Sequence, residues 1–213
     1  MATILQIVTL ATVLLVQVRG HGRLIEPPSR SSMWRYRFDN PVNYDDNQLY
    51  CGGYDHQWRV NQGRCGVCGD PYDGPRENEA GGTFANGIIV RQYQEGDIIN
   101  VKVQLTKSHL GWFEFRLCPN NNVNRAVTQE CLDSNLLESP NGFTRYNVRS
   151  WDAMVHSLKV RLPRGVTCTQ CVLQWKYNAG NNVDCDSNGN CCKGCGPQEQ
   201  FYGCADVSIS PRW

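Results

Sequence analysis

Four histidines are the side chains of this chain best suited to bind a metal or to move a proton near neutral pH. They are His21, His56, His109 and His156. His156 shares its strand parity with Leu158 and Val160, which predicts a half-buried position. His56 lies in a loop flanked by cysteines, which favours the surface. His109 lies where one strand pattern ends and the next begins, so we expect a turn that exposes its imidazole.

The histidine at position 21 directly follows an apolar leader, MATILQIVTLATVLLVQVRG (residues 1–20). The only charged residue of this leader is Arg19, and its apolar run is too short to span a bilayer and typical of a secretory signal. Val18 and Gly20, at positions −3 and −1 of a cut before His21, are small enough for signal peptidase. We therefore expect residues 1–20 to be removed and residues 21–213 to form a single secreted domain.

Cleavage before His21 would give one residue two nitrogen ligands. The unperturbed pKa is about 8 for an α-amino group and about 6.5 for an imidazole, so both can be neutral donors near pH 7. With the ring of His109, three nitrogens can surround one ion in a T-shaped plane, which suits Cu(II). Zinc would prefer a tetrahedron with a fourth ligand. The residues therefore predict a site for one copper ion.

All 12 cysteines follow the leader, and their number is even. In a secreted chain this predicts up to six disulfides, with a pairing that the sequence leaves open. The motifs CGVC, CTQC and CCKGC are also typical of zinc sites. Secretion and loop-rich surroundings favour disulfide bridges over zinc.

The charges of the secreted part cancel. The whole chain has 21 Lys plus Arg against 20 Asp plus Glu, and the leader removes one arginine and no acid. This balance argues against nucleic acid or an anionic membrane as a partner. We expect a monomer that binds neither.

Short segments in which apolar residues alternate with polar ones recur along the second half of the chain. The elements that they form must position these histidines. The segments are residues 97–105, 111–117, 156–162, 171–177 and 205–210. Such segments predict half-buried strands, and two sheets packed face to face give an all-β sandwich. Residues 26–80 are rich in Pro, Gly and Asn, which predicts long loops stapled by cysteines, with a short helix near residues 31–36.

Several stretches in order along residues 21–209 resemble the lytic polysaccharide monooxygenases, most nearly auxiliary activity family 15, an animal and algal group once classed with chitin-binding type 4 domains. The stretches are HGRLIEPPSRSSMWR (21–35), NPVNYDDNQLYCGGY (40–54), GRCGVCGD (63–70), FEFRLCPNNN (113–122), TCTQCVLQWKYNAGN (167–181) and GPQEQFYGCADVSI (196–209). The resemblance implies an immunoglobulin- or fibronectin III-like β-sandwich with long disulfide-stapled loops and short helices.

The resemblance also implies roles for single residues. His21 would bind copper through its amine and ring, and His109 through its ring. The axial position, three residues before a cysteine, falls on Phe201, which strand parity supports; Tyr202 is the alternative. Glu199 would hydrogen-bond to oxygen species near the metal. The chain departs from many relatives at Lys107, where they have alanine.

The implied reaction is oxidative cleavage of β-1,4-glycosidic bonds in crystalline chitin or cellulose, with oxidation at C1 favoured. It would use O2 or H2O2 and an external electron donor. Tyr54 and Trp58 are candidates to stack on sugar faces. Other aromatic residues with the same potential are Trp34, Tyr36 and Trp112.

Two other interpretations stay open. The chain could be a non-catalytic chitin- or cellulose-binding module in which His21 and His109 are bystanders, or a copper-storage or signalling protein without a polysaccharide surface. A glycoside hydrolase would need two carboxylates across a cleft. Glu26, Glu114 and Glu199 form no recognisable pair of this kind, which argues against that class.

Overall fold

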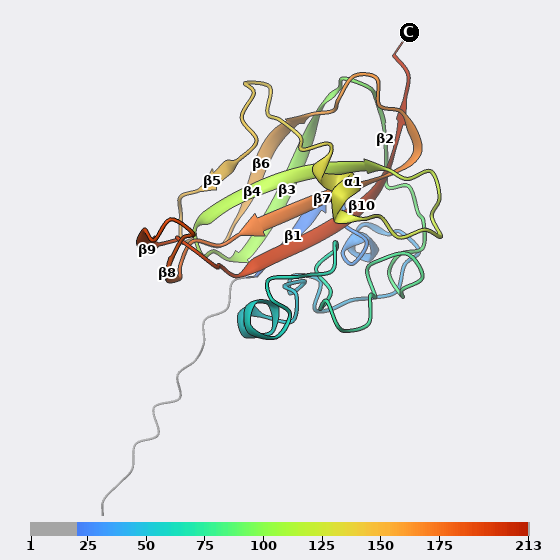
Figure 1. Cartoon of the computed structure of the whole chain (residues 1–213). Coiled ribbons are helices and arrows are strands. Elements are labelled where there is room, and N and C mark those ends of the chain that lie inside the picture. Colours follow the sequence, from blue (N-terminus) through green and yellow to red (C-terminus); the bar gives the residue numbers. More distant parts are fainter. Residues whose placement is uncertain (1–20, 213) are drawn as a thin grey trace, which may run out of the picture.

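Two β-sheets pack face to face in the computed structural model, which describes residues 21–212 (Figure 1). The predicted leader, residues 1–20, lies outside the described residues. A sheet of three strands has the order β1 (His21–Glu26), β3 (Ile98–Lys107) and β6 (Met154–Arg161). A sheet of five strands has the order β2 (Arg91–Gln94), β10 (Gln200–Ser210), β7 (Cys168–Asn178), β4 (Gly111–Pro119) and β5 (Tyr146–Val148). The predicted all-β sandwich is confirmed.

Neighbouring strands are antiparallel, apart from the parallel pair β2 and β10. A hairpin of β8 (Val183–Cys185) and β9 (Cys191–Lys193) follows β7, at the end of the sandwich where β10 begins (Figure 1). No helix in residues 21–212 is long and apolar enough to cross a membrane.

The core between the sheets comes from the residues that the alternation predicts to share a face. Val101, Val103 and Leu105 of β3 are buried, and so are Phe113 and Phe115 of β4. All five predicted strands form, because each can turn one apolar face to the other sheet. β1 was not predicted, since only Gly22 and Leu24 of its residues are buried and glycine is no strand signal.

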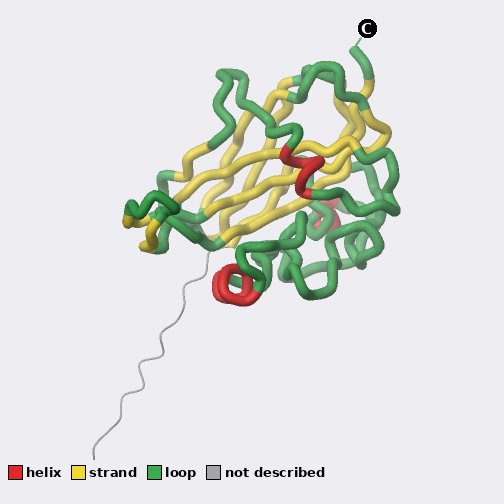
Figure 2. The backbone as a smooth tube through the Cα atoms, in the orientation of Figure 1, coloured by secondary structure: helices red, strands yellow, loops and turns green. Residues whose placement is uncertain are grey.

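Residues 27–90 form long loops with two short helices, the 3-10 helix η1 (Met33–Tyr36) and the π-helix η2 (His56–Val60). Figure 2 shows how little of this segment is regular. Val67 and Cys68 of these loops pack with Val172 and Cys204 on the outer side of β7 and β10. Both faces of these two strands are therefore buried. The short helix α1 (Gln129–Asp133) lies beside β4.

A buried ion pair joins the loops to β10. Arg30 donates from Nε and Nη2 to both carboxylate oxygens of Asp206, at 2.7 Å each. Its Nη1 donates to the carbonyl of Asn78 at 2.8 Å, and the Gln170 amide donates to Asp206 at 2.7 Å. The arrangement satisfies a charge pair that burial would otherwise make costly.

All 12 cysteines form disulfides, as predicted, and the zinc interpretation is wrong. The pairs are Cys51–Cys65, Cys68–Cys204, Cys118–Cys131, Cys168–Cys171, Cys185–Cys191 and Cys192–Cys195. The bond from Cys68 to Cys204 ties the long loops to β10 across 136 positions of sequence.

Candidate metal centre

The strand pairing brings His21 close to His109. β1 lies antiparallel to β3, and its first residue, His21, is the register partner of Lys107, two residues before His109. The hydroxyl of Thr106 donates to the carbonyl of His21 at 3.4 Å. His21 therefore begins β1 beside the end of β3, and His109 follows that end by two residues although it lies 88 positions from His21 in sequence.

A β-bulge separates His21 from the rest of β1. The register shifts between His21 and Gly22, and bulges of this kind re-aim the side chain next to them. A Cβ atom on Gly22 would lie 2.6 Å from the side chain of Leu105 and 3.1 Å from that of Trp175. Only glycine lets β1 approach the core this closely at that position.

His109 is buried, with 3% of its surface exposed, so the expected exposure of its imidazole is wrong. The turn does lie between β3 and β4 as predicted, but the ends of β7 and β10 cover it. The backbone N–H of His109 donates to the Tyr177 hydroxyl at 2.9 Å, and that hydroxyl donates to the Leu110 carbonyl at 2.6 Å. Burial raises the pKa of Tyr177 to about 12, so the hydroxyl keeps its proton.

The backbone after His109 is strained in a way that fixes the turn. Leu110 has φ of 57° and Gly111 has φ of 92°, both in the left-handed region. A Cβ atom on Gly111 would lie 2.0 Å from the carbonyl oxygen of Asn178. The turn therefore depends on this glycine and on close contact with the end of β7. Tyr177 is a positioning residue that sequence reasoning missed, because in CVLQWKY it reads only as a strand residue.

Glu199 lies next to the ring of His109. Its Oε2 is 3.4 Å from His109 Nδ1, and that nitrogen is buried without a hydrogen bond to any residue of 21–212. The contact is therefore electrostatic. The carbonyl of Glu199 accepts from Ala179 N–H at 2.9 Å, which fixes the backbone directly before β10.

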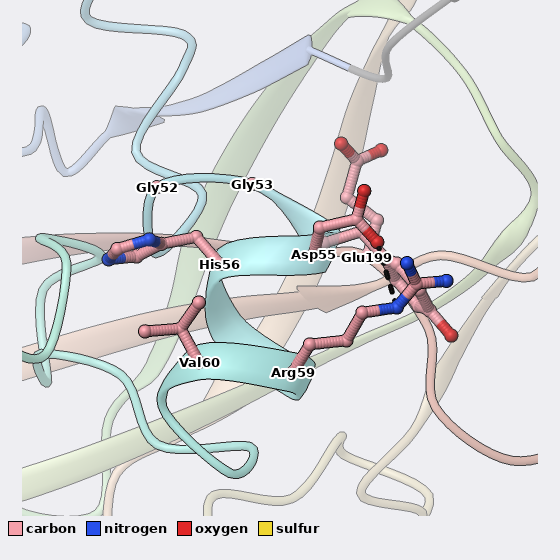
Figure 3. Close-up of a pocket in the computed structure, with 8 residues that line it drawn as sticks. Gly52, Gly53, Asp55, His56, Arg59, Val60 and Glu199 are labelled. Atoms are coloured by element: carbon pink, nitrogen blue, oxygen red, sulfur yellow. Dashed lines mark ion pairs between the residues drawn. The ribbon is translucent and has the colours of Figure 1, made fainter.

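Glu199 also lines an open pocket formed with residues 52–55 and η2 (Figure 3). Asp55 and Arg59 form a 3.2 Å ion pair on the side of η2 that Glu199 occupies, whereas His56 and Val60 extend to the other side. His56 pairs with Asp73 at 2.7 Å, on the side of η2 away from Glu199. The predicted surface position of His56 agrees with its exposure of about a third.

The two predicted sugar-stacking residues lie in different places. Tyr54 lines the pocket that Glu199 lines, and its hydroxyl donates to Asp184 of the β8–β9 hairpin at 3.4 Å. Trp58 lies on another surface, beside Tyr202, and its indole N–H donates to the Gln198 carbonyl at 2.8 Å. The structure thus brings Tyr54, but not Trp58, to the pocket beside Glu199.

Phe201 and Tyr202 point to opposite faces of β10. Phe201 is fully buried between the sheets and stacks on Tyr177 at 5.7 Å and on Tyr50 at 6.0 Å between ring centroids. Tyr202 faces the loops, donates its hydroxyl to Gln200 at 2.8 Å and lies under Lys176. Of the two rings, Phe201 contacts the tyrosine that holds the His109 turn.

The donor set fits copper. All cysteines are in disulfides, and residues 21–212 hold no cluster of three or more His, Cys, Asp or Glu side chains placed for a metal. Two imidazoles and, after cleavage, one amine would be the available ligands, and His109 offers a buried ring nitrogen without a hydrogen bond. Nitrogen donors in this number suit Cu(II) better than a tetrahedral zinc site.

Comparisons with known proteins agree with this geometry. The family model described as lytic polysaccharide mono-oxygenase, cellulose-degrading, matches residues 21–207. The chain is 46% identical to an AA15 lytic polysaccharide monooxygenase from Thermobia domestica, solved in the Cu(I) state, over 89% of this chain and 98% of that one, with a TM-score of 0.86. A chitin binding domain from Burkholderia pseudomallei is 11% identical, covers 90% of this chain and 100% of its own with a TM-score of 0.51, and supports the fold alone. No curated protein matches.

Proposed function

The chain belongs to the lytic polysaccharide monooxygenases and is a copper-dependent oxidoreductase, and from this premise we propose that it cleaves β-1,4-glycosidic bonds of crystalline chitin or cellulose by oxidation at C1. The observation that carries the proposal is the register of β1 and β3, which places His21 opposite Lys107 and so beside the buried turn of His109. The matched family region begins at residue 21, which supports a catalytic domain of residues 21–213.

His21 would hold copper through its amine and ring once residues 1–20 are removed, and His109 through its ring. When bound, copper supplies the one-electron redox chemistry that activates O2 or H2O2 at the expense of an external electron donor. Six disulfides support an oxidising, extracellular compartment for this secreted chain.

Phe201 is the proposed axial residue rather than Tyr202, because it stacks on Tyr177 on the side of β10 that faces the core. An apolar ring offers no ligand atom, so it would exclude a strong axial ligand. Glu199 would hold or move a proton, since its carboxylate lies 3.4 Å from His109 and lines an open pocket.

The proposed substrate is an insoluble polysaccharide. The matched family is described as cellulose-degrading, and the resemblance seen in the sequence implies chitin or cellulose, so both polymers are to be tested. Tyr54, beside Glu199, is the better placed of the two predicted stacking residues.

Mass spectrometry of soluble products tests the reaction. Mature protein beginning at His21, loaded with copper and given ascorbate, is expected to release oligosaccharides oxidised at C1 from shrimp chitin or from cellulose, and His109→Ala protein is expected to release none. Products without oxidation, or no products from either polymer, would favour the non-catalytic binding module.

A second preparation tests the metal site. Protein that keeps Gly20 before His21 has an amide in place of the amine and is expected to lose most copper affinity in calorimetry. Equal copper affinity of the Gly20-extended and mature proteins would contradict the proposed role of the His21 amine.

A further inference from the structure

We propose that Asp46 is a positioning residue for the metal site: together with Asn47 it clamps the start of β1 so that the amine and ring of His21 are held in place before the metal binds. This inference rests on the proposed role of His21 as a ligand. Both residues lie in the loop between η1 and η2.

Asp46 is buried, with no exposed side-chain surface, between two arginines from different elements. Arg23 of β1 donates from Nη1 to Oδ1 at 2.5 Å. Arg35 of η1 donates from Nε to Oδ2 at 2.6 Å and from Nη2 to Oδ1 at 3.1 Å. Arg23 also donates from Nε to Gln104 of β3 at 2.9 Å. One carboxylate therefore joins β1, through Arg23, to η1.

The next residue, Asn47, binds the backbone of Gly22 and the side chain of Thr106. The Asn47 carbonyl accepts from Gly22 N–H at 3.0 Å, and the Asn47 amide donates to Thr106 Oγ1 at 2.9 Å. The same Thr106 hydroxyl donates to the His21 carbonyl. The loop thus binds β1 on the side that has no neighbouring strand, and it also binds β3.

The position of β1 in the sheet explains why such a clamp is needed. β1 is at the edge of the three-stranded sheet and pairs only with β3. Once the leader is removed, His21 is the first residue of the chain, and terminal residues fray unless they are tied down. A chelate formed by the amine and ring of one residue requires that residue's backbone to be fixed, because a loose ligand must be ordered when the metal binds.

Residues that orient metal ligands typically change metal affinity by about 10- to 100-fold when they are removed. Asp46→Asn is nearly isosteric, removes the charge that both arginines bind, and leaves an amide group in its place. We therefore expect Asp46→Asn to weaken copper binding by about 10- to 100-fold and to loosen β1 even without metal.

The test compares three single variants of the mature protein: Asp46→Asn, Asp45→Asn and Asp206→Asn. Asp45→Asn is the matched control, since Asp45 is the exposed neighbour and its hydrogen bonds are local, to Asn43 and Gln48. Asp206→Asn breaks the buried pair of Arg30 with Asp206 of β10 and controls for general destabilisation. The probes are copper affinity by calorimetry, the EPR spectrum of bound Cu(II), and hydrogen exchange of residues 22–26 in copper-free protein.

The expected result is faster exchange in β1, weaker copper binding and an altered EPR spectrum for Asp46→Asn alone. Asp46→Asn protein that matches Asp45→Asn protein in all three measurements would overturn the inference, as would equal effects from Asp206→Asn. If Asp46→Asn does not fold, Arg23→Gln opens the same clamp from the β1 side and is judged by the same outcomes.

Different results would overturn the proposed function and this inference. Mature wild-type protein that binds no copper would overturn the role of His21 as a ligand. The exchange of β1 in copper-free protein would still show whether Asp46 holds that strand.

Discussion

Tyr177 shows how a single hydroxyl can hold the buried turn that contains His109. It accepts from the His109 N–H and donates to the next carbonyl, so both polar groups of a strained turn are satisfied away from water. The stacking of Phe201 on the same ring links the proposed axial residue to the ligand. At this scale the backbone of the His109 turn is held by neighbouring side chains.

Tyr177→Phe is expected to lower the free energy of unfolding by about 1–3 kcal/mol, because it leaves a buried N–H and a buried carbonyl without partners. It is also expected to weaken copper binding by shifting the His109 turn. Chemical denaturation and calorimetry measure the two effects. Tyr146→Phe is the control, since Tyr146 is also buried and donates only to the Lys159 carbonyl, remote from the turn. A similar loss of copper affinity in both variants would refute the specific role of Tyr177.

The sequence predicted the two histidines as a pair, because their chemistry is visible in the residue types. It did not predict that His109 is buried, since burial comes from Tyr177 and Glu199, which lie 68 and 90 positions further along the chain. Only the folded strands bring these side chains to the turn.

At the scale of elements, β1 depends on close contact with the core. Gly22 leaves no space for a side chain between Leu105 and Trp175, and the bulge beside it turns His21 out of the regular register. Two features therefore position β1, the strand of the proposed ligand His21. One is the lack of a side chain at Gly22, and the other is the proposed clamp of Asp46.

Gly22→Ala is expected to destabilise the protein by about 1–3 kcal/mol through overpacking and to displace His21. The melting temperature and copper affinity should both fall. The second substitution Leu105→Val, which shortens the side chain that the new methyl group meets, is expected to restore part of both. Gly22→Ala protein with unchanged copper affinity would show that β1 tolerates a shift without moving the ligand.

β6 carries a titrating group in the sheet that contains β1. His156 packs edge to face on Phe113 at 5.2 Å, and burial lowers its pKa below the usual value. The unfolded chain therefore takes up a proton more readily, so stability from this residue is full above about pH 6.5 and is lost as the pH falls below it.

His156→Phe keeps an aromatic ring against Phe113 and removes the titration. Between pH 7 and pH 5, copper-free wild-type protein is expected to lose more free energy of unfolding than His156→Phe protein, as measured by chemical denaturation at both pH values. Equal losses would show that burial of His156 does not contribute to the pH dependence.

Alternation predicted the strands in which apolar and polar residues alternate, and it missed the first half of β10. The first half of β10, QFYGC, shows no alternation because Phe201 faces the core while Tyr202 and Cys204 lie under the loops. The prediction for this strand began only at residue 205 for that reason.

Over the whole molecule, disulfides join elements that the hydrophobic core leaves apart. Cys68–Cys204 closes 136 positions of chain and binds the long loops to β10, whereas Cys168–Cys171 closes only three within β7. The number of disulfides followed from the cysteine count, but the pairing did not, because it depends on which loops the fold brings together.

Removing Cys68–Cys204 by paired alanine substitutions is expected to cost about 3 kcal/mol more than removing Cys168–Cys171, from the logarithmic dependence of loop-closure entropy on loop length. Denaturation of the two double variants under oxidising conditions measures the difference. Equal losses would indicate that packing around the sulfur atoms outweighs the entropy of the unfolded chain.

The complete pairing of the cysteines also affects how the enzyme resists oxidative damage. A protein that activates oxygen is the nearest target of its own stray oxidants, and residues 21–212 offer them no free thiol that could be carried to sulfinic or sulfonic acid. Of the two methionines in that range, Met33 is fully buried and Met154 is 44% exposed on the edge strand β6. Among the methionines of residues 21–212, only the thioether of Met154 is therefore accessible to oxidants, and its oxidation to the sulfoxide can be reversed.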